Sequence, residues 1–177
     1  MNKLLLVLTA FILPFTAYAQ GYEIKVHAKG LGNKTVYLAH HFANNKRILA
    51  DDTLQLNKNG KGVFKGNKKL KGGMYLIFFP NRSYFDFLVG DNQEFSITLT
   101  QANPLQNAAF RGSEINSAFL DYRKFIRTQR KKMNEAQKAK KAAKKADNKS
   151  AIQQQNKVID EINQEVKEKR QELAKEY

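Results

Sequence analysis

Hydrophobic and polar residues alternate in several short segments of the first half of the chain. Residues 22–28 read YEIKVHA and residues 94–100 read EFSITLT. Because successive side chains of a strand point to opposite faces, this period of two predicts strands with one buried face. Turn-forming pairs such as Asn59-Gly60 separate the segments, as expected between the strands of hairpins.

Two further segments are apolar on both faces. Residues 74–79 read MYLIFF and residues 84–89 read YFDFLV, which is typical of strands buried between two layers. A last short strand is expected at residues 108–111. The pattern contains about eight short strands in all, and this number predicts an antiparallel β-sandwich or barrel. We assign this domain to residues 20–112, in a chain that is mainly β with an appended α region.

After Gly112 the hydrophobic period changes to that of a helix. Ser113 is a candidate N-cap for it, and Asp147-Asn148 interrupts the helical pattern. Ser150, followed three residues later by Gln153, is a candidate cap for a second helix. Apolar residues mark one face of each helix: Ile115, Phe119, Tyr122, Ile126 and Met133 in the first, and Ile152, Ile159, Ile162, Val166 and Leu173 in the second.

The simplest arrangement for residues 113–177 is an antiparallel helical hairpin with facing apolar stripes, resembling a coiled coil. One long helix with a weak middle is the alternative. Oligomerisation through these helices stays open. Helix-forming residues continue to Tyr177 without a stop signal, so we expect the chain to end inside a helix, as a fragment of a longer protein would.

The N-terminus has the pattern of a secretory signal peptide. Lys3 precedes an apolar run over residues 4–13, and Ala17-Tyr18-Ala19 forms an A-x-A cleavage site. The run is shorter than the roughly 20 apolar residues of a membrane-spanning helix. We therefore expect residues 1–19 to be removed after Ala19, and the protein to reach the periplasm of a Gram-negative bacterium.

Charge and cysteine content narrow the function further. The formal net charge is +15, from 31 lysines and arginines against 16 acidic residues, which favours a polyanionic partner. The chain contains no cysteine. This excludes thiolate nucleophiles, CxxC redox chemistry and cysteine-ligated zinc in this polypeptide.

The histidines and carboxylates form no recognisable catalytic or metal-binding pattern. His40 and His41 are adjacent and would point to opposite faces of a strand, and His27 has no evident partner. Asp51 and Asp52 would likewise diverge on an extended chain. We therefore predict that this chain is not an enzyme and has no catalytic, cofactor-binding or metal residues, and that it needs no cofactor.

Asp86 interrupts an otherwise apolar strand. It could be a binding-face carboxylate, but an exposed strand position or an ion pair with a nearby lysine or arginine is the favoured interpretation.

The segment KAKKAAKKADNKS at residues 138–150 is almost entirely lysine and alanine. A solvated helix face is the favoured interpretation, an anionic envelope surface is second, and nucleic acid is third because no aromatic residue for base stacking lies nearby. The candidate polyanion-contacting residues are Lys138, Lys140, Lys141, Lys144, Lys145 and Lys149.

Several turn and core motifs, spread over roughly residues 21–125, resemble a known module. It is the β-rich domain of unknown function of the DUF4369 type, found at the N-terminus of exported TlpA-like and AhpC/TSA-type thiol-disulfide oxidoreductases. The motifs are Lys34-Thr-Val-Tyr-Leu38, Asp52-Thr53, Asn59-Gly-Lys-Gly-Val-Phe64, Gly73-Met-Tyr-Leu76, Gly90-Asp91, and Phe110-Arg-Gly-Ser113 with Asn116.

The resemblance implies an accessory or interaction module serving a thioredoxin-like domain, in cis or in trans. In such proteins the helical stretch leads into the redox domain, whose CxxC is absent here. The alternative is a stand-alone cell-envelope binding protein that uses its basic helices on anionic glycan or lipid.

Overall fold

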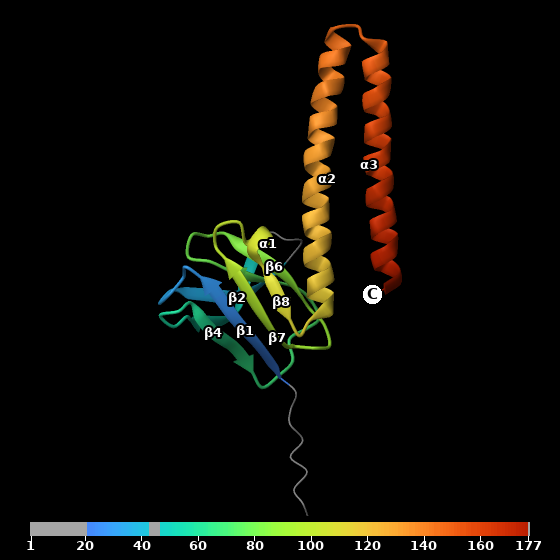
Figure 1. The fold of residues 1–177 in the computed structure, drawn as a ribbon. Helices are drawn as coiled ribbons and strands as arrows, with labels where there is room; N and C mark the ends of the chain where they lie inside the picture. Colours follow the sequence, from blue (N-terminus) through green and yellow to red (C-terminus); the bar gives the residue numbers. More distant parts are fainter. Residues whose placement is uncertain (1–20, 43–46, 177) are drawn as a thin grey trace, which may run out of the picture.

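The computed structural model describes residues 21–42 and 47–176, so the predicted signal peptide lies outside the described part of the chain. A β domain carries a long helical hairpin that projects away from it (Figure 1). The elements are β1 (Tyr22–Lys29), β2 (Thr35–Phe42), β3 (Arg47–Gln55), β4 (Lys61–Gly66), β5 (Gly73–Phe78), β6 (Tyr84–Val89), β7 (Glu94–Thr100), α1 (Pro104–Asn107), β8 (Ala109–Arg111), α2 (Glu114–Lys145) and α3 (Lys149–Glu176).

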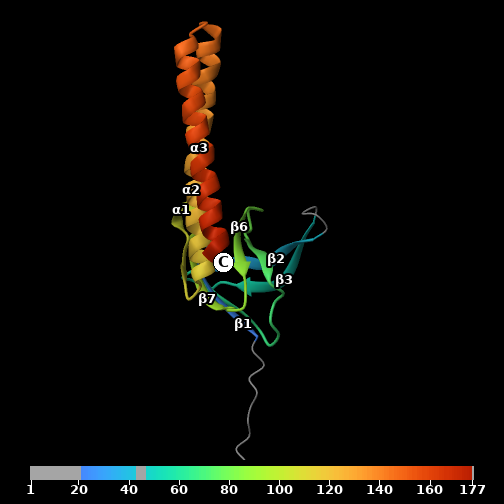
Figure 2. The same cartoon turned by 90° about the vertical axis from the view of Figure 1, so that its right-hand side faces the viewer.

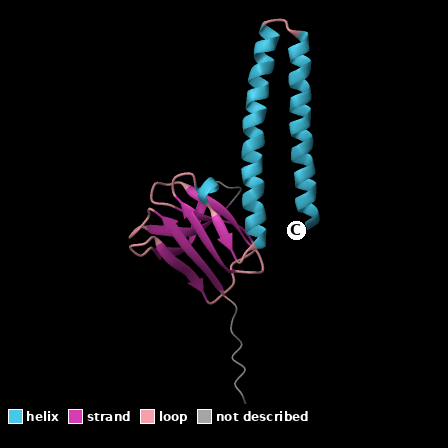
Figure 3. Ribbon diagram, viewed as in Figure 1, coloured by secondary structure: helices cyan, strands magenta, loops and turns pink. Residues whose placement is uncertain are grey.

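The strands form two four-stranded sheets, with the orders β4-β1-β7-β8 and β3-β2-β5-β6. Figure 3 shows these strands gathered in one body, with the long helices α2 and α3 outside it. The predicted sandwich is confirmed, and the sheets do not close into a barrel. The pairing is mostly antiparallel, but β1 and β7 run parallel, with Ile24 opposite Phe95. Hydrophobic periodicity does not encode strand direction, so this pair was not predicted.

The core lies between the two sheets. Phe87 of β6 meets Phe95 of β7 edge to face, with 6.0 Å between ring centroids, and so joins the two layers. Burial of such aromatic and aliphatic side chains is the main stabilising term of the domain. The largest fully buried side chains are Phe64, Phe79, Phe85, Phe87, Ile24, Leu38, Leu56, Leu76, Ile77, Ile97, Leu99 and Val36.

A β-bulge interrupts the pairing of β2 with β3. Leu38 lies opposite Asp52, whereas Ala39 lies opposite Ala50, so Asp51 is the extra residue. A bulge breaks the strict alternation of side chains. Both carboxylates consequently reach groups on the inner side of the sheet, and the prediction that they diverge was wrong because it assumed a regular strand.

Helix α2 ends at the predicted break. Asp147 adopts a left-handed backbone with φ of 48°. The Asp147 N–H donates to the Lys144 carbonyl at 3.2 Å, and the Asn148 N–H donates to the Ala143 carbonyl at 3.0 Å. This is the Schellman pattern, which satisfies the last carbonyls of a helix and turns the chain.

Helix α3 is capped by Asn148 rather than by Ser150. The Ala151 N–H donates to Asn148 Oδ1 at 3.0 Å. Ser150 already lies inside α3, which begins at Lys149. The predicted cap was wrong because Asn148, placed by the turn at Asp147, reaches the free amides first.

The two helices pack antiparallel along their length, and α3 returns to the root of α2 (Figures 1 and 2). Thirty-two residues make α2 about 48 Å long. Few side chains are buried between the two helices: among the described residues these are the apolar Ala136 and Ile162 and the polar Gln129. Within the described residues, none of the helices combines the length and apolar content that crossing a membrane requires.

Candidate functional site

The root of α2 is joined to the edge of the second sheet by Asn116. Leu88 of β6 donates its N–H to Asn116 Oδ1 at 2.7 Å, and Asn116 Nδ2 donates back to the Leu88 carbonyl at 2.7 Å. Asn116 Nδ2 also reaches Ser113 Oγ at 2.9 Å, and the Asn116 side chain is fully buried. The amide thus pairs with the backbone of an edge strand as a neighbouring strand would, which protects that edge.

Asp86 lies two residues from Leu88 on the same strand and pairs with α2. Arg123 approaches Asp86 Oδ2 at 3.1 Å and donates through a second nitrogen to the Asp86 carbonyl at 3.0 Å. The guanidinium also lies 5.5 Å from the ring centroids of Phe85 and Phe119. The prediction of an ion-paired Asp86 is confirmed. The Asp86 carboxylate has a structural role, because its ion pair with Arg123 holds α2 on the sheet.

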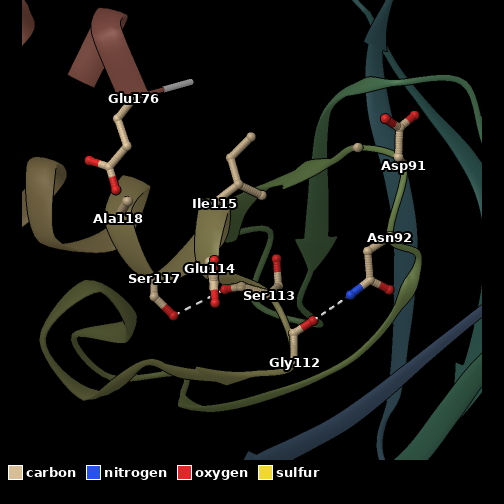
Figure 4. Close-up of a pocket in the computed structure, with 10 residues that line it drawn as sticks. Asp91, Asn92, Gly112, Ser113, Glu114, Ile115, Ser117, Ala118 and Glu176 are labelled. Atoms are coloured by element: carbon tan, nitrogen blue, oxygen red, sulfur yellow. Dashed lines mark hydrogen bonds between the residues drawn. The ribbon is translucent and has the colours of Figure 1, made fainter.

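A crevice of about 810 Å³ lies beside this root (Figure 4). It is bordered by residues 90–92, by the start of α2 and by Glu176 at the end of α3. Asn92 Nδ2 donates to the Gly112 carbonyl at 2.7 Å, and the Ser117 hydroxyl donates to the Ser113 carbonyl at 3.1 Å. The polar groups therefore stabilise the corner of the chain, and the described lining pairs no nucleophile with a base.

A second polar cluster lies at one end of the sandwich, where the bulge turns Asp51 and Asp52 inward. Tyr22 donates its hydroxyl proton to Asp52 Oδ2 at 2.9 Å, and His40 Nδ1 lies 2.7 Å from Asp51 Oδ2. Burial, the hydrogen bond to Asp52 and the negative charge of both carboxylates raise the pKa of Tyr22 to about 12. Burial, followed by the charge of Asp51, also raises the pKa of Tyr75. Each phenol thus stays neutral well above physiological pH.

The cluster opens into a cavity of about 520 Å³ that Lys69 and Lys71 also line. Leu70, which lines the cavity, is held in place by the buried Gln93: the Leu70 N–H donates to Gln93 Oε1 at 2.8 Å, and Gln93 Nε2 donates to the Leu70 carbonyl at 2.9 Å. A histidine oriented by a carboxylate is half of a catalytic triad, and among the described residues no serine or threonine hydroxyl lines this cavity. The described groups suit polar packing or binding.

The three histidines lie apart. His40 faces Tyr75 and His41 faces Tyr84, at 5.9 Å between ring centroids in each case, so the neighbours occupy opposite faces of the sheet. Burial and the charges of Lys61 and Lys29 lower the pKa of His27. In the described ranges, no three histidine, aspartate or glutamate side chains gather closely enough to hold a metal ion.

The predicted polyanion-contacting lysines lie at the far end of the hairpin. Lys138, Lys141, Lys144, Lys145 and Lys149 are exposed and Lys140 is half-buried. Across the residues that the structure describes, no carboxylate lies within ion-pair distance of these six lysines. Residues 138–149 contain one acidic residue, Asp147, whereas residues 160–176 of α3 contain six. Positive charge is therefore concentrated at the tip.

The class defined by these features is a two-sheet sandwich with a helical hairpin rooted on one sheet edge. The chain belongs to the DUF4369 family, described as a domain of unknown function, whose match covers residues 22–119. No curated protein and no solved structure matches the chain. The family match includes Asn116, Asp86 and the polar cluster at the end of the sandwich, but ends before Arg123 and the lysine-rich tip.

Sequence reasoning missed both the inward turn of Asp51 and Asp52 and the anchoring role of Asn116. Two consecutive aspartates in a β-rich segment are a weak signal for a bulge, because isolated charges are also common on exposed strands. Asn116 at the third position of a helix gives no periodic signal. Asn116 anchors the helix by bonding Leu88, which lies 28 residues earlier in the sequence and comes close to Asn116 through the tertiary fold.

Proposed function

We propose that the chain is a non-catalytic accessory and interaction module of a periplasmic thiol-disulfide oxidoreductase system, with a thioredoxin-like domain as its partner in cis or in trans. The observation that carries this proposal is the rooted hairpin. Asn116 and Arg123 fix α2 on β6, and α3 then returns to the crevice beside residues 90–92. A partner held by this end of the hairpin would keep a fixed position relative to the β domain.

The motifs that resemble the N-terminal modules of exported oxidoreductases, together with membership of the DUF4369 family, support the same role. The absence of cysteine means that any thiol chemistry has to come from the partner.

The first test is to sequence the DNA that adjoins this coding sequence. We expect that DNA to encode a thioredoxin-like segment with a CxxC motif, either in frame or in a neighbouring gene. That redox domain, produced separately, should bind the chain in a calorimetric titration. A matched redox domain from an unrelated protein serves as the control. The proposal is contradicted if no such segment exists, if the encoded domain does not bind, or if this chain alone reduces insulin.

The lysine-rich tip favours a second function, which is binding to the cell envelope. At the end of the hairpin, six lysines that form no ion pair within the described structure suit contact with an anionic lipid or glycan surface. Such binding weakens with salt because exposed charges are screened within about 10 Å at 0.1 M ionic strength.

Co-sedimentation with phosphatidylglycerol vesicles at low and high salt tests this alternative, with phosphatidylcholine vesicles as the neutral control. A variant with the six tip lysines changed to glutamine should lose binding at low salt. A variant with six β-domain lysines changed to glutamine (Lys25, Lys29, Lys34, Lys58, Lys61 and Lys68) removes the same charge and should retain it. Equal retention by both variants, or no retention of the unmodified chain, would exclude the tip as a binding element.

A further inference from the structure

The strand β3 is an uncovered edge of the second sheet. Among the described residues it is the longest strand, with nine residues, and β2 is the one strand that pairs with it. Helix α2 covers the opposite edge, β6, and the short β8 is the edge of the other sheet beside α2. The Leu54 end of β3 approaches β4 at Gly62, and Asp52 accepts a hydrogen bond from Tyr22 of β1. Within the described residues, positions 47–50 have no backbone hydrogen bond to an element other than β2.

This free half is apolar as well as unpartnered. Ile48 is 39% exposed and Leu49 is 42% exposed, and the adjacent Phe42 of β2 is 53% exposed. Natural edge strands usually carry lysine, proline or an inward charge where another strand could add. Residues 48–50 carry neither charge nor proline, and the bulge and the inward charge of Asp51 begin only at the next residue. In the described structure, the outward N–H and carbonyl groups of every second residue have no backbone partner. The segment is therefore suited to strand addition.

The charges that flank this segment favour a second copy of β3 as the strand that adds to it. In an antiparallel pairing of β3 with itself, Leu49 can lie opposite Leu49 on a twofold axis. Ile48 then lies opposite Ala50, and Arg47 lies opposite Asp51 of the second copy, so that each opposite-charge pair occurs twice. The sequence RILAD at residues 47–51 is thus self-complementary in this register.

The faces of the two strands also agree. Arg47 and Leu49 lie on the inner face with Phe42 and His40, their partners on β2. Asp51 is turned to that same side by the bulge, where its Oδ2 meets His40 and its Oδ1 is left for a cation. A twofold axis perpendicular to the sheet keeps the inner faces of both copies on one side, so Arg47 and Asp51 meet on a common face.

We propose that two copies of this chain associate through β3, joining their β3-β2-β5-β6 sheets into one continuous eight-stranded sheet. The hairpins do not obstruct this pairing, because each is rooted on β6 at the far edge of its own sheet. The dimer therefore carries its two hairpins at opposite ends. This arrangement is independent of the redox and envelope functions proposed above, and it differs from association through the helices.

A cross-linking experiment tests the register directly, since the chain has no cysteine of its own. Directly opposite Cα atoms in antiparallel strands are about 4.5–5.5 Å apart, within the range that a disulfide bridges. Leu49→Cys should form a disulfide-linked dimer under mild oxidation. Val63→Cys is the matched control, because Val63 on β4 is also 42% exposed, and it should stay monomeric. Equal cross-linking of both variants, or none in either, would overturn the proposal.

Sedimentation velocity over a range of protein concentrations tests the ion pairs. Arg47→Asp places two carboxylates opposite each other at both ends of the pairing, and should weaken the dimer roughly tenfold or more. Arg111→Asp makes the same charge change on the exposed β8 and should leave the dimer unchanged. A chain that is monomeric at every concentration, or an Arg47→Asp variant that dimerises normally, contradicts this interface. Circular dichroism confirms that each variant is folded.

Discussion

The hydrogen bonds of Asn116 make a sharp prediction about how the hairpin is anchored. Asn116→Ala removes the two bonds to Leu88 and the bond to Ser113 Oγ, and leaves a backbone N–H and a backbone carbonyl without partners beneath α2. A hydrogen bond contributes about 0.5–1.5 kcal/mol net, and a buried group left without a partner costs about 1–3 kcal/mol. We expect a loss of roughly 3 kcal/mol in the free energy of unfolding, within these ranges.

At this chain length each kcal/mol corresponds to about 2–4 °C in Tm, so the expected decrease is about 6–12 °C. The assay is thermal and urea unfolding, followed by near-UV circular dichroism for the β domain and by the 222 nm signal for the helices. Asn134→Ala, at an exposed asparagine on the same helix, is the matched control; because alanine has the higher helix propensity, it should leave stability unchanged or raise it by less than about 1 kcal/mol.

Asn116→Asp separates the amide's two roles, because a carboxylate accepts from the Leu88 N–H but donates nothing to the Leu88 carbonyl. It should therefore also be destabilised, by burial of a charge and by loss of the donor. If Asn116→Ala and Asn134→Ala unfold at the same urea concentration, Asn116 does not anchor the hairpin.

Three further predictions concern other contacts. The pKa of Tyr22 is about 12 in the folded chain against 10.0 ordinarily, so the folded state holds the phenolic proton more tightly than the unfolded state. The free energy of unfolding should therefore fall as the pH rises from about 10 to 12. Urea unfolding at a series of pH values should show this decrease, and Tyr22→Phe should remove it. Gln129→Leu removes a buried Oε1 that has no partner among the described residues, but also the 2.6 Å hydrogen bond from Gln129 Nε2 to the exposed Glu165; because water can replace that bond, we expect a net stabilisation of the hairpin of less than about 1 kcal/mol in the 222 nm melt, and none for the matched change at the exposed Gln137. Replacing residues 138–149 by a short glycine linker should leave the near-UV spectrum of the β domain unchanged, because α2 is anchored at Asn116 and Arg123; unfolding of the β domain would show that its boundary is misplaced.

The strands and the hairpin could be predicted because their signals are local. Alternation in residues 22–28 and 94–100 reflects one buried face, and the break at Asp147-Asn148 reflects a backbone that leaves the helical region. Asp86 could be interpreted as ion-paired because an isolated carboxylate between two phenylalanines needs a partner.

The remaining features depend on contacts between distant segments. The parallel pairing of β1 with β7 joins residues about 70 positions apart, and alternation is the same for either strand direction. The inward turn of Asp51 and Asp52 requires the bulge opposite Leu38, which is a property of the pair of strands and not of β3 alone. Asn148, and not Ser150, caps α3 because the turn at Asp147 fixes where the helix begins.

We propose that this chain acts by binding and positioning a redox partner, and that it contributes no thiol chemistry of its own. The most direct test of this proposal is a calorimetric titration of the chain with the thioredoxin-like domain that the same or an adjacent gene encodes, combined with insulin reduction by each component. We expect saturable binding, with insulin reduction by the redox domain and none by this chain. Absence of binding, or insulin reduction by this chain alone, would contradict it.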